Sequence, residues 1–341
     1  MFSKVKDGFR TITETIGKTS LRQAVLGRAT GVFVAVFAAG SLLPAQVLPL
    51  ERHAAAAEEP VSPVPEPRLE DPLKVLLGES LFGDPRLSLG NSRSCSSCHD
   101  LGSNGATGGA RDKALDGSDL PLNTSTVFNA ALSFRLNWEG GFRTLEDQAQ
   151  ALIENPRIMG GSIDDAVGKL KLDPEMAGRF RAAFGRDPDA AGLLEALAAF
   201  QRSLLTPGSR FDRWLGGDAA ALSDEEIDGY RQFKSLGCAS CHQGVNVGGN
   251  LFQRHGIFHP LASPEPAVLR VPSLRNVAMT PPYFHDGSAS TLDVAVRKMA
   301  RAQLNSELTD RQAEVIVAFL RTLTGEFRDR QVEESRVGGS R

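Results

Sequence analysis

Cys95-Ser-Ser-Cys98-His99 and Cys238-Ala-Ser-Cys241-His242 decide how this chain is organised, because together they use all four of its cysteines. Cys-x-x-Cys-His is the attachment pattern of a c-type haem, in which the two thiols add to the vinyl groups and the histidine becomes the proximal iron ligand. A thioredoxin-like dithiol needs no following histidine, and zinc knuckles rarely place one directly after the second cysteine. The motifs therefore predict two covalently bound haem c groups, with His99 and His242 as iron ligands.

The two motifs lie about one domain length apart. A chain of 341 residues is long enough for two domains, each with its own core. From Leu69 onward the pattern is mostly helical, with long Gly-rich loops around the haem sites. We therefore expect a mainly α protein made of two cytochrome c-like domains, with one haem each. The predicted parts are an export signal, an N-terminal haem domain, a C-terminal haem domain and a loose tail, at residues 1–57, 58–215, 216–327 and 328–341.

The two halves of the chain form a weak internal repeat around the haem motif. Local sequence signals mark the helices within these halves. Capping boxes, apolar residues at helical spacing, and a terminating proline or glycine are the signals used. The segments predicted as helical are Thr144–Glu154, Ala190–Leu205, Ser223–Leu236, Thr291–Leu304 after an N-cap at Ser290, and Thr309–Gly325.

The first 57 residues differ in composition from the remainder of the chain. Basic side chains predominate at the start, an apolar stretch follows over residues 31–43, and Ala54–Ala57 offers an Ala-x-Ala cleavage site. This pattern predicts export, cleavage near Ala57 and a periplasmic protein. An uncleaved anchor is the alternative, but Pro44 helps to interrupt the apolar run short of the ~20 residues that a span needs. The net charge of −3 argues against a general nucleic-acid binder.

The side chain opposite each proximal histidine decides what the iron can do. Met299 lies well past the second motif and is a candidate distal ligand, with core packing as the alternative reading of this methionine. No histidine lies between His99 and His242, so only Met159 and Met176 could ligate the first iron within its own domain. We expect that neither does. A haem whose sixth coordination position is filled, together with a haem whose sixth position is open, favours a redox enzyme over a simple electron carrier.

Further stretches of the sequence resemble the bacterial dihaem cytochrome c peroxidases, over Leu73–Gly325. The resemblance implies that the first haem is the peroxidatic one and the second the high-potential one, with Met299 as the distal ligand of the second. The stretches that carry the resemblance are Leu77–Ser88, Asn123–Asn129, Trp138-Glu-Gly, Leu204–Pro207 and Leu274–Gly287.

The same resemblance implies a calcium ion between the haems. Asn123, Thr280 and Pro282 fall on the family's calcium site, where an amide oxygen and two backbone carbonyls are suitable hard ligands. Trp138 falls on the tryptophan that lies between the two haems in the family, so it is a candidate for electron transfer.

Two positions depart from the family pattern. Leu115 stands where many of these peroxidases have a loop histidine that blocks the first haem until the second is reduced. Ile158 stands where they have a distal glutamate. Gln148 matches a distal glutamine of the family, and Glu154 lies one helical turn before Ile158, so both are catalytic candidates. The missing histidine predicts an enzyme that needs no reductive activation, as in the relative that matures the tryptophylquinone of methylamine dehydrogenase.

The leading hypothesis is therefore a periplasmic peroxidase that reduces hydrogen peroxide to water with electrons from a small cytochrome c or cupredoxin. One alternative is a dihaem oxidase that modifies aromatic residues of a partner protein, against which Met299 argues because the maturing relative has tyrosine there. The other alternative is a plain dihaem electron carrier, which would need both irons six-coordinate. The sequence leaves the donor and the oligomeric state open, a homodimer included.

Overall fold

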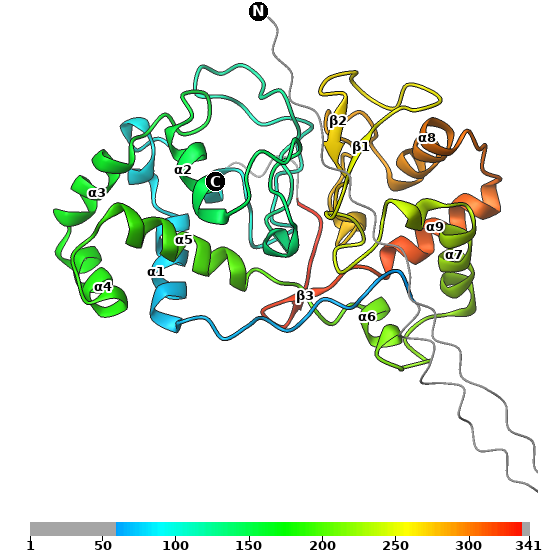
Figure 1. Cartoon of the computed structure of the whole chain (residues 1–341), viewed down its shortest axis with the longest axis horizontal. Helices are drawn as coiled ribbons and strands as arrows, with labels where there is room; N and C mark the ends of the chain where they lie inside the picture. Colours follow the sequence, from blue (N-terminus) through cyan, green and yellow to red (C-terminus); the bar gives the residue numbers. More distant parts are fainter. Residues whose placement is uncertain (1–58, 336–341) are drawn as a thin grey trace, which may run out of the picture. The chain divides into compact units, whose positions relative to one another are not determined.

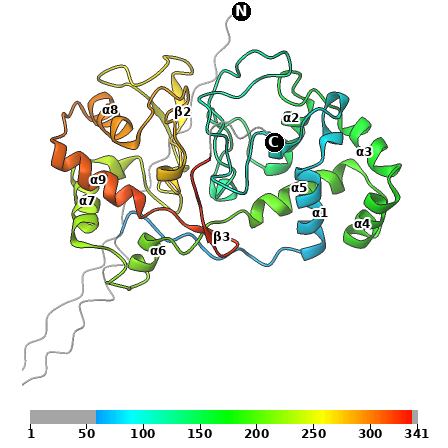
Figure 2. The ribbon, with the colours of Figure 1, turned by 180° about the vertical axis from the view of Figure 1, so that it is seen from behind.

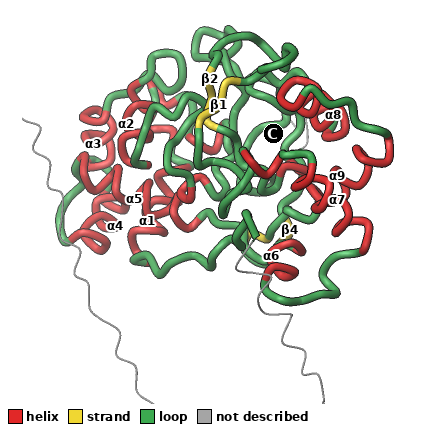
Figure 3. The backbone as a smooth tube through the Cα atoms, turned by 45° about the vertical axis from the view of Figure 1, so that its right-hand side comes forward, coloured by secondary structure: helices red, strands yellow, loops and turns green. Residues whose placement is uncertain are grey.

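The computed structural model describes residues 59–335, so the expected export signal lies outside the described residues. The described chain is mainly helical, and the predicted fold class is confirmed (Figure 1). Figure 3 shows in green the long loops that separate the helices. Over residues 59–335, no helix is both long enough and apolar enough to cross a membrane.

The first half of the described chain is built on five helices. α1 and α5 cross with their backbones in contact, because a Cβ on Gly78 would overlap the carbonyl oxygen of Ala196. The apolar side chains around this crossing form the core of the first half, including the buried Phe180 and Phe200. The helices are α1 (Pro72–Phe82), α2 (Leu145–Glu154), α3 (Ile163–Lys171), α4 (Pro174–Phe184) and α5 (Ala190–Ser203).

The second half repeats this crossing. A Cβ on Gly229 of α7 would overlap the carbonyl oxygen of Val315 in α9, so glycine is required at both crossings. The helices gather into these same two groups when the molecule is seen from behind in Figure 2. The helices of the second half are α6 (Arg210–Leu215), α7 (Asp224–Ser235), α8 (Leu292–Leu304) and α9 (Asp310–Arg321).

The loops that follow the motifs repeat as well. Asn129 and Asn276 both have left-handed backbones, with φ of 59° and 60°, and each begins a 3₁₀ turn. A single β-bridge follows each turn, and then α2 begins after its N-cap Thr144 and α8 after its N-cap Thr291. The predicted N-cap of α8, Ser290, is therefore wrong by one residue, because the Thr291 hydroxyl is the one that accepts from the helix amide.

Within residues 59–335, four short strands form two antiparallel pairs. β1 (Phe252–Arg254) pairs with β2 (Val268–Arg270), and Phe252 lies opposite Arg270. β3 (Glu326–Phe327) pairs with β4 (Arg330–Gln331) directly after the last helix. That helix, α9, ends at Arg321 rather than at Gly325, and the chain then turns into β3.

The two ends of the described chain pack against opposite halves. Val61 and Val64 lie against the second half, where Val61 is part of its core, whereas Phe327 and Val332 belong to the core of the first half. The Phe327 ring lies 4.9 Å from the Phe128 ring. The structure therefore differs from two expectations: residues 59–64 do not pack with the N-terminal domain, and residues 328–332 are not a loose tail. Apolar side chains at both ends gain burial by crossing over.

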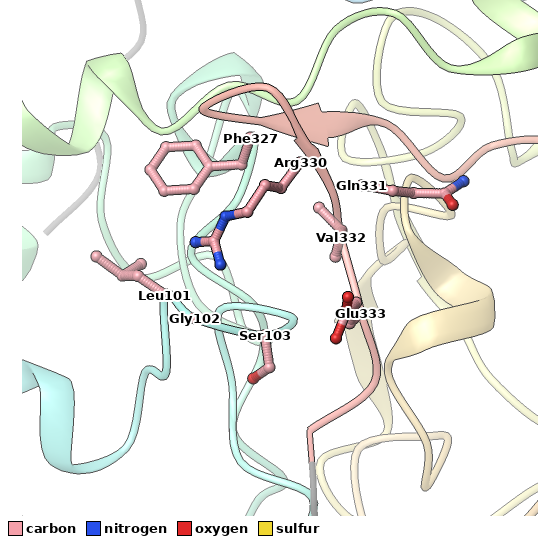
Figure 4. A pocket seen from close by; sticks show the side chains of 8 residues that line it. All are labelled: Leu101, Gly102, Ser103, Phe327, Arg330, Gln331, Val332 and Glu333. Atoms are coloured by element: carbon pink, nitrogen blue, oxygen red, sulfur yellow. The ribbon is translucent and has the colours of Figure 1, made fainter.

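Residues 327–333, near the end of the described chain, also lie beside the first motif. Figure 4 shows Phe327, Arg330, Val332 and Glu333 around a small pocket whose opposite wall is the segment 101–103. This wall begins two residues after His99. The hairpin formed by β3 and β4 thus packs against the loop that follows the first haem motif.

Candidate functional site

The first motif is held in a fixed geometry by its own backbone. Cys95–Ser97 form a 3₁₀ turn, and the amide of His99 donates to the carbonyl of Cys95 at 3.0 Å. The His99 ring places Nδ1 3.0 Å from the carbonyl oxygen of Gly105. Because a carbonyl can only accept, Nδ1 carries the proton and Nε2 keeps its lone pair for a metal. Burial lowers the pKa of His99, which favours the neutral imidazole that iron ligation needs.

The second motif is built in the same way. The amide of His242 donates to the carbonyl of Cys238 at 3.0 Å, and Nδ1 lies 3.2 Å from the carbonyl oxygen of Val247. Burial lowers the pKa of His242 to about 4. In each half a phenylalanine ring lies beside the motif histidine, with 6.3 Å between the ring centroids. These pairs are Phe82 with His99 and Phe233 with His242. Each phenylalanine follows the glycine of its helix crossing by four residues.

Both motifs fit a covalently attached haem better than a zinc ion. A structural zinc ion is held by four convergent ligands from Cys, His, Asp and Glu side chains. Over residues 59–335, no group of three or more His, Cys, Asp and Glu side chains is arranged to hold a metal ion. The residues present in each motif are two thiols and one imidazole with a free Nε2, which is the set that haem c uses.

Trp138 lies where the two halves meet. Its indole N–H donates to the carbonyl of Asn123 at 2.8 Å, and its own carbonyl accepts from the Arg270 amide at 2.7 Å. The Trp138 ring is edge-on to His285, with 6.2 Å between the ring centroids. Contacts to both halves hold the tryptophan in place, and its role in electron transfer stays a prediction.

Of the three residues assigned to calcium, Asn123 contacts this junction through Trp138. The Asn123 amide donates to the His285 carbonyl at 2.7 Å, and Nδ2 donates to the carbonyls of Gly109 and Ala110 at 3.1 Å each. This leaves the side-chain oxygen of Asn123 available to a cation. Thr280 and Pro282 precede His285 by five and three residues in the sequence, and a calcium site made with their carbonyls stays a prediction.

The distal residues of the first half do not all converge. Leu115 donates its amide to the Arg157 carbonyl at 2.9 Å, and a Cβ on Gly160 would touch the Leu115 methyl, so this side chain lies against the turn that carries Ile158. Gln148 donates through Nε2 to the side chain of Asn137.

Glu154 lies apart from Gln148. It is exposed and lies 3.4 Å from the side chain of Gln150. Six residues apart on one helix, Gln148 and Glu154 point in directions about 120° apart around its axis. The structure therefore does not bring these two predicted catalytic residues together.

Sequence reasoning missed a buried ion pair beside the second motif. Arg275 and Asp212 are 2.8 Å apart, and both side chains are almost fully buried. Arg275 also donates to the carbonyl of Val245 at 2.8 Å, two residues before Val247, whose carbonyl orients His242. Asp212 lies in α6 and Arg275 in a loop far from it in the sequence, so no local signal marked this pair.

Two similarly built Cys-x-x-Cys-His sites on a mainly α scaffold define a dihaem c-type cytochrome. Residues 72–220 match the family model described as di-haem cytochrome c peroxidase, and residues 226–324 match the cytochrome c model. The cytochrome c551 peroxidase of Nitrosomonas europaea is 39% identical over 289 residues, which cover 80% of this chain and 86% of the relative. The chain belongs to the dihaem cytochrome c peroxidase family, as the sequence resemblance predicted.

Two further relatives extend this result. The methylamine utilization protein MauG of Methylorubrum extorquens is 34% identical over 290 residues, which cover 77% of this chain and 82% of the relative. The crystal structure of a MauG-like protein associated with microbial copper homeostasis matches with a TM-score of 0.67 and 27% identity, over 77% of this chain and 94% of that one. The chain is a peroxidase-like oxidoreductase with two haem c groups.

Proposed function

We propose that this protein is a periplasmic cytochrome c peroxidase that reduces hydrogen peroxide to water, with electrons from a small cytochrome c or cupredoxin. The observation that carries the proposal is the distal loop of the first half. Leu115 lies against the Ile158 turn, and an alkyl side chain offers iron no lone pair. The first site thus stays open to a small oxidant. When bound at His99, haem c supplies an iron that can bind peroxide and exchange electrons.

The roles of the other residues follow from their contacts. The Gly105 carbonyl fixes the His99 imidazole, and the Asn137 side chain fixes the Gln148 amide that we assign to the distal pocket. Trp138, held between the halves, is assigned to electron relay. Met299, partly buried in α8, is assigned as the distal ligand of the second haem.

The calcium ion and the location belong to the same proposal. Asn123, Thr280 and Pro282 would bind calcium next to Trp138, where the ion would hold the junction between the halves. The predicted export signal over residues 1–57 supports a periplasmic location, because thioether attachment of haem takes place outside the cytoplasm in bacteria.

A dihaem oxidase that modifies aromatic residues of a partner protein is the second candidate. The 34% identity to a MauG protein favours it, as does Leu115 in place of a blocking histidine. Met299 argues against it, because it occupies the place where the maturing relative has tyrosine.

The experiment that tests the proposal mixes the oxidised two-haem protein with hydrogen peroxide in a stopped-flow spectrometer. We expect a reaction without prior reduction, and one high-spin and one low-spin ferric haem by electron paramagnetic resonance. Leu115→His should introduce a blocking ligand and make the reaction depend on reducing the second haem. Leu172→His, at an exposed position after α3, is the control and should change neither property. Two low-spin haems with no response to peroxide would favour the electron carrier instead.

A further inference from the structure

Arg270 is one of two arginines that are buried among residues 59–335. It is 9% exposed, and its Nε donates to the Asn137 carbonyl at 3.1 Å. A guanidinium carries five N–H donors and is always charged. Over residues 59–335, the other four donors of Arg270 have no acceptor, and no carboxylate forms an ion pair with it. The charge of this buried side chain is therefore unpaired within the described part of the chain.

Arg275, the second buried arginine, shows what such a side chain requires. It lies 2.8 Å from Asp212 and donates to the carbonyls of Val245 and Ser62 at 2.8 Å each. Burial lowers the pKa of both arginines, but the Asp212 carboxylate opposes this effect at Arg275, whereas no charge among the described residues does so at Arg270. A buried cation is costly unless an anion and hydrogen-bond acceptors surround it. We therefore expect Arg270 to find its anion in a group that binds here.

The first half of the molecule contacts Arg270 through two neighbouring residues. The Arg270 amide donates to the Trp138 carbonyl at 2.7 Å, and its Nε donates to Asn137. The Asn137 side chain accepts in turn from Gln148, which we assign to the distal pocket of the first haem. Arg270 therefore lies beside the tryptophan assigned to electron relay, and one residue, Asn137, links it to Gln148.

The second half carries Arg270 in β2, next to the loop that orients His242. A Cβ on Gly248 would lie 2.1 Å from the carbonyl oxygen of Pro272 and 3.5 Å from Nδ1 of His242. Pro272 follows Arg270 by two residues. The same loop supplies the Val247 carbonyl that lies 3.2 Å from Nδ1 of His242. Arg270 thus lies between parts of the chain that adjoin each haem site.

We propose that Arg270 binds a propionate carboxylate of haem c at the junction of the two halves. Each haem carries two propionates, and a carboxylate matches a guanidinium through two parallel N–H···O bonds. The first or the second haem can supply this carboxylate, because Arg270 contacts residues next to both sites. The proposal rests on the two haem c groups and not on the reaction with peroxide proposed above.

This contact has a consequence for the reduction potential of the haem whose propionate is bound. Ferric haem carries one more positive charge than ferrous haem, so a cation fixed beside it favours reduction. One charge about 10 Å from the iron, at an effective dielectric constant of about 20, shifts this one-electron equilibrium roughly tenfold. The Arg270 charge therefore raises the potential of that haem, and its loss should lower it.

The test is a redox titration of the two-haem protein with mediators, in which each haem is followed by its own spectrum. At a fixed potential, Arg270→Gln should lower the ferrous-to-ferric ratio of one haem about tenfold, equal to a fall of about 59 mV. Arg270→Lys keeps the charge and should stay within about twofold of the wild type. Arg254→Gln is the matched control, because it removes an exposed charge from β1, the strand paired with β2. Water screens that charge, so the control should also stay within about twofold.

The haem whose potential falls is the one whose propionate Arg270 binds. No fall at either haem, or equal falls at both, overturns the proposal, as does an Arg270→Lys variant that behaves like Arg270→Gln. If Arg270→Gln does not load both haems, a crystal structure of the wild-type two-haem protein decides. A guanidinium nitrogen about 3 Å from a propionate oxygen supports the proposal, and a guanidinium that contacts no propionate overturns it. A two-haem protein that ignores peroxide would instead refute the proposed function and leave this test unchanged.

Discussion

Thr206→Val is expected to destabilise the protein far more than the same substitution at two other buried threonines. The Thr206 hydroxyl accepts from the side-chain amides of Asn129, at 2.7 Å, and Asn276, at 3.0 Å. Both asparagines are completely buried, at 1% and 0% exposure. They occupy equivalent positions in the two repeated loops, so the Thr206 hydroxyl accepts one hydrogen bond from each half.

The magnitude follows from the number of hydrogen bonds lost. Valine has nearly the shape of threonine, so Thr206→Val leaves two buried amide donors without an acceptor and opens no cavity. Each such donor costs about 1–3 kcal/mol, which lowers the free energy of unfolding by roughly 2–6 kcal/mol. The Thr322 hydroxyl donates one bond, to the Phe319 carbonyl, so Thr322→Val should cost about 1 kcal/mol. The Thr324 hydroxyl is buried with no partner among residues 59–335, so Thr324→Val should be neutral or stabilising.

Urea unfolding of the two-haem protein, followed by circular dichroism, measures this series. Intact mass should first show that each variant carries both haems. The expected order of destabilisation is Thr206, then Thr322, then Thr324. A Thr206 variant no less stable than the Thr322 variant would refute the reasoning, because the two asparagine amides would then have found other acceptors.

Three further variants test the assigned sites. Met299→Ala should lower the potential of the second haem and remove its near-infrared sulfur-to-iron band; a band that persists would mean that another methionine is the ligand. Ile158→Glu should speed the peroxide reaction, since a positioned acid–base group contributes ~10²–10⁴-fold, and an unchanged stopped-flow rate would place this residue out of reach. Cys95→Ser combined with Cys98→Ser should lower the intact mass by one haem, and an unchanged mass would contradict covalent attachment there.

The parts of the fold that follow from local chemistry could be predicted from the sequence. The Ser223–Glu226 capping box begins α7 as expected, because both partners of its hydrogen bonds lie within one turn. The choice between Ser290 and Thr291 at α8 could not be made, because two adjacent hydroxyls compete and only the backbone geometry decides. Pairs distant in sequence, such as Arg275 with Asp212, leave no periodic signal and required the structure.

The candidate site also has parts that could be predicted from the sequence and parts that required the structure. The two Cys-x-x-Cys-His motifs carry their chemistry within five residues, so their assignment needed no fold. The carbonyls that orient His99 and His242 come from loops whose course the sequence does not specify.

Residues near each end of the described chain pack into the core of the opposite half, and this has a consequence for how the protein folds. Phe327 and Val332 complete the core around Phe128, although the ribosome makes them about two hundred residues later. Chains generally fold domain by domain, N-terminal part first, as they are synthesised. Here the first half keeps part of its core uncovered until Phe327 and Val332 reach it. A nascent chain that stops after α9 would therefore carry both haem motifs and still lack a closed first half.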